Sequence, residues 1–387
     1  MIPDESAGFV LHGGDSGLHE TGSVRPFETL GLADPPERTF ITPPHGSWSL
    51  FLAVRGDGSW TLSNELCRIG VSSRELADGS STRLPAGTRF TAREDGSWTS
   101  RPAVTEYEAA TENPAATSEM TVEDAMTWVD QVLQHEAACL ATRGQPVRLL
   151  LSGGVDSGLL AAYLSQADAE VSAYSVRTPW GHELDGARRT AEHVGVALDI
   201  VDVTAEQIAE EIPRCMRWLQ SADPELVAVH VLATCAAYLA EAEGADLVTG
   251  LGSDLLNSRR ETGMRAVSSR LADRVRAVSS SGLMATGEPA AGPRMVHPYW
   301  TPRTIPAQLA VPDRFKTSVQ FDKYYLRRLA AEQLPSRIAF GAKVAIHEGS
   351  GLVGGMEAYL RTSPADHCAR LWAQLVADAA GPERGQA

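Results

Sequence analysis

The chain has 387 residues, 43% of them hydrophobic, and a formal net charge of −15. This length is enough for two domains with at least one large core, and a charge of this sign argues against a nucleic-acid partner. No apolar run approaches the roughly 18 to 20 residues that a membrane-spanning helix needs, and the first residues do not resemble a signal peptide. We therefore expect a cytoplasmic protein whose partners are neither nucleic acids nor membranes.

Cysteines and lysines are both scarce. The five cysteines lack the CxxC spacing of a zinc site, and we interpret them as free thiols in a reducing compartment: Cys67, Cys139, Cys215, Cys235 and Cys368. Only three of the 34 basic residues are lysines, namely Lys316, Lys323 and Lys343, and the rest are arginines. In a chain with so strong a preference for arginine, a lysine suggests a position that needs a compact ammonium group.

Residues 1–107 have a β-rich pattern. Hydrophobic residues alternate with smaller or polar ones over residues 48–54, which predicts a half-buried strand. A turn at residues 55–58 and a returning strand at residues 60–63 predict a hairpin. Residues 84–98 contain two further turn and strand signals. We expect this region to be a separate, β-rich domain.

A different pattern follows a polar linker at residues 108–120. Thr121 is a suitable N-cap for a helix that runs to about Thr142. Four short apolar runs then alternate with amphipathic helical stretches, at residues 147–151, 171–176, 198–203 and 246–249. This alternation is typical of a parallel sheet covered by helices, so we expect an α/β domain over residues 121–380, followed by a loose tail.

The most specific motif is the sequence SGGVDS, which follows an apolar strand and opens a predicted helix. Gly153 and Gly154 let the backbone approach a phosphate closely, and the amides at the start of the helix favour an anion. Ser152 and Ser157 add hydroxyl donors. The motif therefore predicts a phosphate-binding loop, although it lacks the spacing of a Walker A motif.

The SGGVDS sequence resembles the pyrophosphate-binding loop of the N-type ATP pyrophosphatases, which cleave ATP between the α and β phosphates. A carboxylate is a poor direct neighbour for phosphate, so Asp156 is best explained as a ligand of Mg²⁺. The strand from Leu247 ends in a GLGSD sequence, which resembles the GxGxD segment of asparagine synthetase-like domains. This resemblance implies that Gly250 lies in the nucleotide site and that Asp254 is the second Mg²⁺ ligand.

Four further segments resemble the β-lactam synthetase and carbapenam synthetase branch of that family: residues 296–300, 321–327, 334–338 and 343–351. The resemblance covers roughly residues 121–355 and is weaker in the N-terminal region. It implies a PP-loop α/β fold, in which helices cover both faces of a parallel sheet. Residues 1–107 would then be a shortened, degenerate form of the glutaminase-like (Ntn-hydrolase-like) domain. ATP and Mg²⁺ are the implied cofactors.

The same resemblance implies roles for individual residues. Lys323 and Lys343 match two lysines that contact the nucleotide phosphates and the reacting centre, so both are candidate catalytic residues. A positive charge there would stabilise the negative charge that develops as pyrophosphate leaves. Val176 lies on the strand that contacts adenine in the family. Lys316 matches no family lysine and is predicted to lie on the surface.

Two features depart from the family. Glutamine-dependent asparagine synthetases use a cysteine at the mature N-terminus, whereas the first cysteine here is Cys67, so we expect no glutamine hydrolysis. β-lactam synthetases have a tyrosine where Leu251 stands, and it works with a glutamate to deprotonate the attacking amine; a matching glutamate is not evident. The base stays open, with four candidates: Tyr299, His297, His347 and Glu348.

These patterns favour an AMP-forming carboxylate–amine ligase that adenylates a small-molecule carboxylate and joins it to an amine as an amide or lactam. Antibiotic or other specialised-metabolite biosynthesis is the expected setting. One alternative is a cyclase that closes a peptide macrolactam, and another is a non-catalytic nucleotide-binding scaffold. A tRNA-thiolating enzyme is disfavoured by the negative charge. The sequence leaves the oligomeric state open, with a homodimer as one option.

Overall fold

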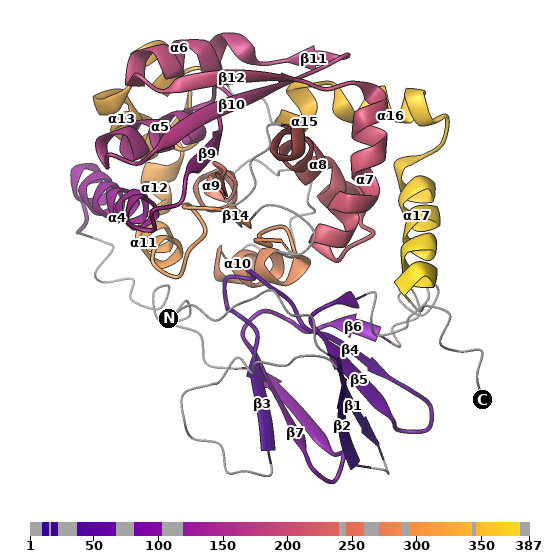
Figure 1. The fold of residues 1–387 in the computed structure, drawn as a ribbon. Coiled ribbons are helices and arrows are strands. Elements are labelled where there is room, and N and C mark those ends of the chain that lie inside the picture. Colours follow the sequence, from indigo (N-terminus) through magenta and orange to yellow (C-terminus); the bar gives the residue numbers. More distant parts are fainter. Residues whose placement is uncertain are drawn as a thin grey trace.

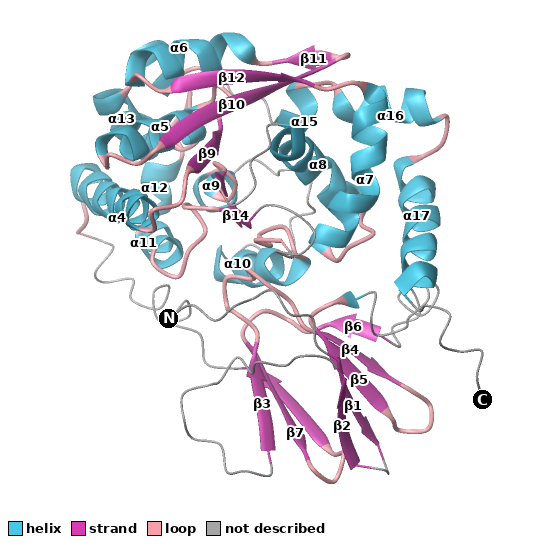
Figure 2. Ribbon diagram, in the orientation of Figure 1, coloured by secondary structure: helices cyan, strands magenta, loops and turns pink. Residues whose placement is uncertain are grey.

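The computed structural model describes residues 10–14, 17–21, 37–66, 81–102, 119–239, 245–258, 271–287, 294–342 and 346–379. These residues form a β-rich N-terminal part and a larger α/β part (Figures 1 and 2). Within these ranges, no helix has both the length and the hydropathy needed to cross a bilayer. The four cysteines that lie in them are free thiols, as expected. Cys67, the tail from residue 381 and nearly all of the expected linker lie outside the described residues.

The N-terminal part contains two antiparallel sheets that share one core. The first has the order β2-β1-β5-β4-β6, formed by Gly17–Thr21, Val10–Gly14, Trp60–Ser63, Phe51–Val54 and Ser81–Arg83. The second has the order β3-β7-β8, formed by Glu37–Ile41, Thr88–Arg93 and Trp98–Pro102. Trp60 from the first sheet packs edge-on against Phe90 from the second, at 5.5 Å between ring centroids. The β4–β5 and β7–β8 hairpins confirm the hairpins predicted from the turn signals.

The α/β part is built on one six-stranded sheet. Its strands are β9 (Val147–Leu150), β10 (Val171–Thr178), β11 (Gly181–His182), β12 (Ala197–Asp202), β13 (Asp246–Val248) and β14 (Arg294–Val296). The order is β11-β10-β9-β13-β14, and β12 also pairs with β10. Every pairing is parallel except β10 with β11. The four strands predicted from the apolar runs are all present.

Helices account for most of the remaining described residues. They are α4 (Val122–Thr142), α5 (Val155–Gln166), α6 (Leu184–Val194), α7 (Ala205–Leu219), α8 (Pro224–Leu239), α9 (Ser253–Asn257), α10 (Leu271–Ser281), α11 (Thr304–Ala310), α12 (Asp313–Lys316), α13 (Tyr324–Gln333), α14 (Ser336–Ala339), α15 (Ile346–Gly349), α16 (Leu352–Leu360) and α17 (Pro364–Ala379). Thr121 caps α4 in a capping box with Asp124, which confirms the predicted start of this helix.

Side chains alternate between the two faces of the sheet, and each face has its own core. Leu149 and Val248 belong to a cluster with α4, α5 and α13, whereas Leu150 and Leu247 belong to a cluster with α7 and α8. Neighbouring residues of a strand point to opposite faces, so apolar runs rather than alternating patterns are needed here. The fold is thus the expected α/β class, with helices on both faces of a mainly parallel sheet.

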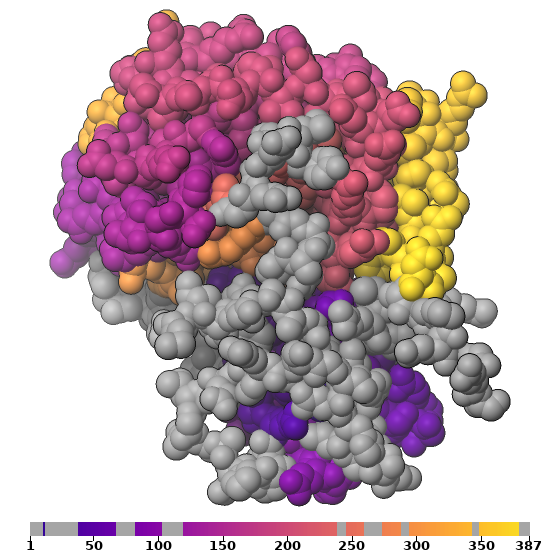
Figure 3. Space-filling model, viewed as in Figure 1, coloured from indigo at the N-terminus to yellow at the C-terminus, as the bar shows by residue number. Residues whose placement is uncertain are grey.

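The two parts meet along α10 and the loops beside it. In Figure 1, α10 is the helix of the α/β part that lies against the N-terminal strands. Figure 3 shows from the same side that the coloured atoms of the α/β part lie in the upper part of the molecule and those of the N-terminal part lie below. Several hydrogen bonds cross this boundary, among them Leu66 N to Gln220 Oε1 (2.6 Å) and Ala86 N to Ser280 Oγ (3.0 Å). The N-terminal part is therefore docked rather than merely tethered.

Candidate functional site

The candidate site lies at the carboxyl ends of β9 and β13, two adjacent parallel strands at the centre of the sheet. The chain leaves β9 through the SGGVDS loop into α5, and it leaves β13 through the GLGSD loop into α9. Asp156 and Asp254 thus lie in the first turns of two neighbouring helices. Carboxyl ends of parallel strands are the usual position of ligand sites in open α/β sheets.

The SGGVDS loop is held by internal contacts. Ser157 Oγ accepts a hydrogen bond from Ser152 N (3.2 Å) and lies 3.1 Å from Ser152 Oγ, and its hydroxyl lies 3.3 Å from Gly154 O. Gly154 is the N-cap of α5 and, being glycine, has no side chain to occupy the amides of the first turn. The loop therefore presents backbone donors at the start of a twelve-residue helix, as an anion site requires.

Gly153 has a structural reason of its own to be glycine. Its φ is +76°, and a Cβ there would lie 2.7 Å from Ala187 N and 2.8 Å from Gly186 Cα. Gly153 therefore lets the SGGVDS loop pack closely against the start of α6. The closeness to a phosphate that we expected from the sequence stays a prediction.

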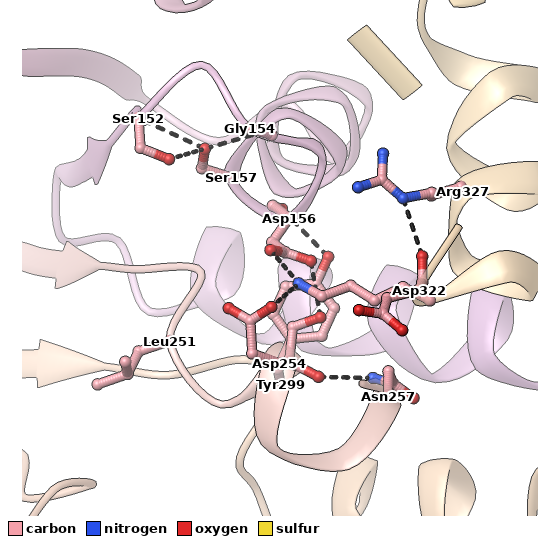
Figure 4. A network of polar contacts seen from close by, with 12 residues as sticks. Ser152, Gly154, Asp156, Ser157, Leu251, Asp254, Asn257, Tyr299, Asp322 and Arg327 are labelled. Carbon is pink, nitrogen blue, oxygen red and sulfur yellow. Dashed lines mark hydrogen bonds and ion pairs between the residues drawn. The ribbon is translucent and has the colours of Figure 1, made fainter. Parts of the chain in front are cut away.

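The two aspartates converge on one ammonium group (Figure 4). Lys323 Nζ lies 2.6 Å from Asp156 Oδ2 and 2.6 Å from Asp254 Oδ1. The side chains of Lys323 and Asp156 are 2% and 5% exposed, while that of Asp254 is 32% exposed. Burial lowers the pKa of Lys323, and the neighbouring Asp156 carboxylate opposes that shift. The arrangement is a buried carboxylate–ammonium–carboxylate cluster that opens to solvent on the Asp254 side.

Backbone geometry at Lys323 directs its side chain into this cluster. Lys323 has a left-handed conformation, with φ of +58°, at the N-cap of α13. Its amide donates to Asn257 O (3.2 Å), and the Asn257 side chain donates to Gln308 Oε1 (2.6 Å) and accepts from Tyr325 OH (2.7 Å). This buried amide network fixes α9 against α13. The sequence does not predict this network, because nothing in an isolated asparagine or glutamine marks it as buried.

Two further side chains support Asp156, one through its carboxylate and one through its backbone. Ser253 Oγ donates to Asp156 Oδ1 at 2.7 Å, and Tyr299 OH donates to Asp156 O at 3.1 Å. Gly250 lies so close that a Cβ there would be 3.1 Å from both Asp156 Cβ and Ser157 N. The GLGSD loop and the SGGVDS loop are thus packed directly against each other. Ser253 belongs to the GLGSD motif, so a position close to Asp156 could have been predicted for it from the sequence.

The candidate bases are placed as follows. Tyr299 is fully buried, burial raises its pKa well above the usual value, and its hydroxyl donates to Asp156 O, so it acts here as a structural donor. His297 lies between Thr249 Oγ1 (2.8 Å) and Ala285 O (3.3 Å), and burial lowers its pKa to about 3. Glu348 is exposed, and the side chain of His347 lies outside the described residues. Leu251 points away from the aspartates in Figure 4.

Three other residues named from the sequence have different outcomes. Val176 is buried among the core residues on the α7 and α8 side of the sheet, and its contact with adenine stays a prediction. Lys343 lies outside the described residues. The surface position predicted for Lys316 is wrong: this side chain is 3% exposed, and its Nζ has no hydrogen-bond partner among the described residues.

The donor set fits Mg²⁺. This ion prefers carboxylate oxygens and usually takes one or two of them while it keeps water and phosphate ligands. Asp156 and Asp254 reach the same nitrogen atom, so their oxygens converge closely enough to serve one cation. The partly exposed Asp254 leaves a side from which a phosphate group can approach.

The family described as Asparagine synthase matches residues 78–279, just over half of the chain. A carboxyethyl-arginine beta-lactam-synthase from Streptomyces clavuligerus is 26% identical over 232 residues, which are 59% of this chain and 45% of that protein. The match thus spans less than half of the relative's length.

Two solved structures are also similar in part. An NMN synthetase from Francisella tularensis is 8% identical with a TM-score of 0.35, and an NH3-dependent NAD synthetase from Campylobacter jejuni subsp. jejuni is 15% identical with a TM-score of 0.32. Each covers 68% of this chain and 97% of its own. The family match, together with the two loops at the carboxyl ends of β9 and β13, confirms the resemblance found in the sequence: the chain belongs to the asparagine synthase family and is similar to its β-lactam synthetase branch.

Proposed function

We propose that this protein is an ATP-dependent ligase that adenylates a substrate carboxylate and converts it into an amide or lactam. The observation that supports this most is the cluster of Asp156, Asp254 and Lys323, with 2.6 Å from the ammonium nitrogen to each carboxylate, beside a glycine-capped helix start. Positive charge and backbone donors next to convergent carboxylates suit a bound nucleotide triphosphate and the pyrophosphate that leaves it.

The proposed reaction has two steps. First, a carboxylate oxygen of the substrate attacks the α-phosphorus of ATP, and the bond from that phosphorus to the pyrophosphate oxygen breaks. Second, an amine attacks the acyl carbon and loses a proton, and the bond to AMP breaks. The amine would come from the same substrate, from a second one or from ammonia, without glutamine hydrolysis.

Residues of both loops have roles in this proposal. Asp156 and Asp254 would hold Mg²⁺, which would neutralise phosphate charge. The amides at the start of α5, with Ser152 and Ser157, would bind phosphate oxygens. Lys323 would stabilise the charge that develops on the phosphates, and Lys343 would act at the reacting centre. We also propose that residues 1–107 and 121–380 are separate domains joined by the linker.

The test measures AMP and pyrophosphate released from ATP and Mg²⁺ across a panel of carboxylates, with hydroxylamine present to trap an acyl-adenylate as a hydroxamate. We expect Asp156→Asn and Asp254→Asn each to lower carboxylate-dependent pyrophosphate release by about a hundredfold or more. Asp202→Asn is the matched control, because Asp202 ends strand β12 of the same sheet but pairs with Arg177 at the surface.

Each other outcome has a definite meaning. Release of ADP and phosphate would contradict adenylation. Full activity in Asp156→Asn or in Asp254→Asn would show that this pair of aspartates, the acid pair, is not part of the active site. Tight ATP binding without turnover on any carboxylate would instead favour a peptide macrolactam cyclase or a nucleotide-binding scaffold.

A further inference from the structure

The N-terminal part presses a short loop against the α/β part close to the candidate site. We call residues 45–47 the docking loop. Gly46 has a φ of +73°, and a Cβ there would lie only 2.1 Å from Ser279 O in α10. Ser47 O accepts hydrogen bonds from Thr286 N (2.9 Å) and Thr286 Oγ1 (3.1 Å). Backbone thus meets backbone, and the contact leaves no room for a side chain.

Trp300 continues this contact inward. It is 2% exposed, and its indole nitrogen donates to His45 O (3.1 Å) in the docking loop and to Ser279 Oγ (3.3 Å) in α10. Tryptophan is a donor through this nitrogen alone, so a buried indole is oriented by whatever accepts that hydrogen bond. The docking loop therefore helps to set the plane and position of the Trp300 ring.

The ring reaches the loop that carries the second aspartate. Gly252 has a φ of +97°, and a Cβ there would lie 3.1 Å from Trp300 Cβ and 3.2 Å from Cε3. Gly252 is the N-cap of α9, whose first residues are Ser253 and Asp254. Ser253 donates to Asp156, and Asp254 contacts Lys323. A shift of the indole would therefore act on the N-cap of α9, the helix that carries Asp254 and the Ser253 hydroxyl that donates to Asp156.

We infer that the docking loop and Trp300 form a positioning element, through which the N-terminal part sets the geometry of Asp254 in the site. Trp300 is a positioning residue in this inference, since it touches the loop and not the reacting groups. The inference rests on the proposed function, because it takes Asp254 as a metal ligand. It assigns the N-terminal part a role in the synthetase reaction that does not depend on any chemistry of its own.

Packing alone would have a different signature. If Trp300 and the docking loop only held the two parts together, their substitution would lower the free energy of unfolding and leave the folded site unchanged. If they position Asp254, the folded variants will bind the metal less tightly. The affinity for the metal in folded protein is therefore the measurement that separates the two roles.

The experiment measures Mn²⁺ binding to the full chain by EPR in the presence of α,β-methylene-ATP, which cannot be cleaved between the α and β phosphates. Trp300→Phe removes the donor and keeps an aromatic ring over Gly252. Gly46→Ala forces the docking loop away from α10. We expect each to weaken Mn²⁺ binding by about threefold to tenfold, the effect of losing or misplacing one hydrogen-bonded support. Steady-state assays should show a higher KM for the metal–nucleotide complex with a smaller change in kcat.

Matched controls carry the same chemical changes elsewhere. Trp372→Phe alters an equally buried tryptophan in α17, on the far side of α7 from the site in Figure 1. Gly58→Ala alters a glycine with φ of +84° in the β4–β5 turn, where a Cβ meets nothing within 4 Å. Both should bind Mn²⁺ as the unaltered protein does. Asp254→Asn should weaken binding and shows that the assay reports on this ligand.

The outcomes separate this inference from the proposed function. Wild-type Mn²⁺ affinity in Trp300→Phe and Gly46→Ala, with weakened binding in Asp254→Asn, would overturn the positioning role alone. Unchanged affinity in Asp254→Asn would overturn the metal assignment and this inference with it. Thermal unfolding of each variant identifies the folded fraction, and Gly46→Ala decides the question if Trp300→Phe does not fold.

Discussion

Two buried lysines show how strongly the fate of an ammonium group depends on its neighbours. Lys316 and Lys323 stand at the two ends of one loop, whose Thr317 and Asp322 form an isolated β-bridge. Lys323 is neutralised by two carboxylates at 2.6 Å. Lys316 is equally buried, yet its ammonium has no hydrogen-bond partner among the described residues. Lys323 is held in the site by its ion pairs, whereas burial of the Lys316 ammonium lowers the free energy of unfolding.

Removing the Lys316 ammonium should stabilise the protein at neutral pH. Burial lowers the pKa of Lys316 from 10.5 to about 8, so the unfolded state binds this proton more tightly than the folded state does. The free energy of unfolding should therefore rise as the pH increases from about 8 to 10.5. Lys316→Met should add about 1 to 3 kcal/mol at pH 7, and the gain should shrink over that window. Urea denaturation at pH 7 and pH 9.5 measures both effects.

A loss of stability in Lys316→Met at pH 7 would contradict this expectation and would show that the ammonium has a partner in solution. Lys316→Arg is the companion variant. A guanidinium stays charged at both pH values, so its own contribution to the free energy of unfolding should not change across this window, and Lys316→Arg should become less stable relative to the unaltered protein as the pH rises.

At the scale of elements, the site depends on turns that only glycine tolerates. The turn at Gly153 joins β9 to α5 and at the same time lets the start of α6 approach, with Gly186 Cα 2.8 Å from where a Cβ would stand. In the same way, the turn at Gly252 joins β13 to α9 and lets the Trp300 ring approach. Both loops of the candidate site are thus fixed from outside by a neighbouring element as well as by their own hydrogen bonds.

Gly153→Ala and Gly195→Ala separate backbone strain from steric contact. Both glycines have nearly the same φ, +76° and +75°, but a Cβ at Gly195 meets nothing within 4 Å. Gly195→Ala should cost about 1 to 2 kcal/mol from the left-handed conformation alone. Gly153→Ala should cost clearly more and should also weaken ATP binding, since it displaces α6 from the loop. Chemical denaturation and ATP titration measure the pair, and equal costs would show that the contact with α6 is readily relieved.

Many of these helices and strands were predictable from the sequence, because apolar runs and capping residues act locally. The strand before SGGVDS, the helix after it and the capping box at Thr121 all follow from a few neighbouring residues. The burial of Lys316 was not predictable, since lysines are almost always exposed and only the tertiary packing overrides this. The same holds for the Asn257 network and for Trp300, which depend on residues far apart in the chain.

At the scale of the whole molecule, the described strands of the N-terminal part and of the α/β part form separate sheets, and side chains and loops join the two parts. Arg83 is one of these side chains. Its guanidinium donates to Ser49 Oγ (2.5 Å) and to Gln220 O (3.2 Å), and it lies over the Phe51 ring at 4.9 Å. Gln220 in turn accepts from Leu66 N. The boundary therefore combines these hydrogen bonds with apolar packing, since Phe51, Ala53 and Leu66 belong to the same buried cluster as residues of α7, α8 and α10.

Arg83→Met should uncouple the two parts. It removes both hydrogen bonds and leaves Gln220 O without this donor, at a cost of about 1 to 3 kcal/mol. We expect differential scanning calorimetry to show the N-terminal part unfolding at a lower temperature, as a separate shoulder. Arg55→Met is the control, because Arg55 is exposed and bonds to Thr61 within the N-terminal part. A single transition at the original temperature would show that the boundary does not depend on Arg83.

Because Lys316 and Lys323 are 3% and 2% exposed, an amine-selective acylating reagent reaches neither of them in the folded protein. Each can react only when its own surroundings open: α12 must move for Lys316, and the acid pair must release Lys323. Local openings of this kind occur well below the free energy of global unfolding. Mass spectrometry of the peptide that contains each lysine gives its rate of acylation. The rate at Lys323 therefore reports how often the candidate site opens, and the rate at Lys316 reports how often the surroundings of α12 open.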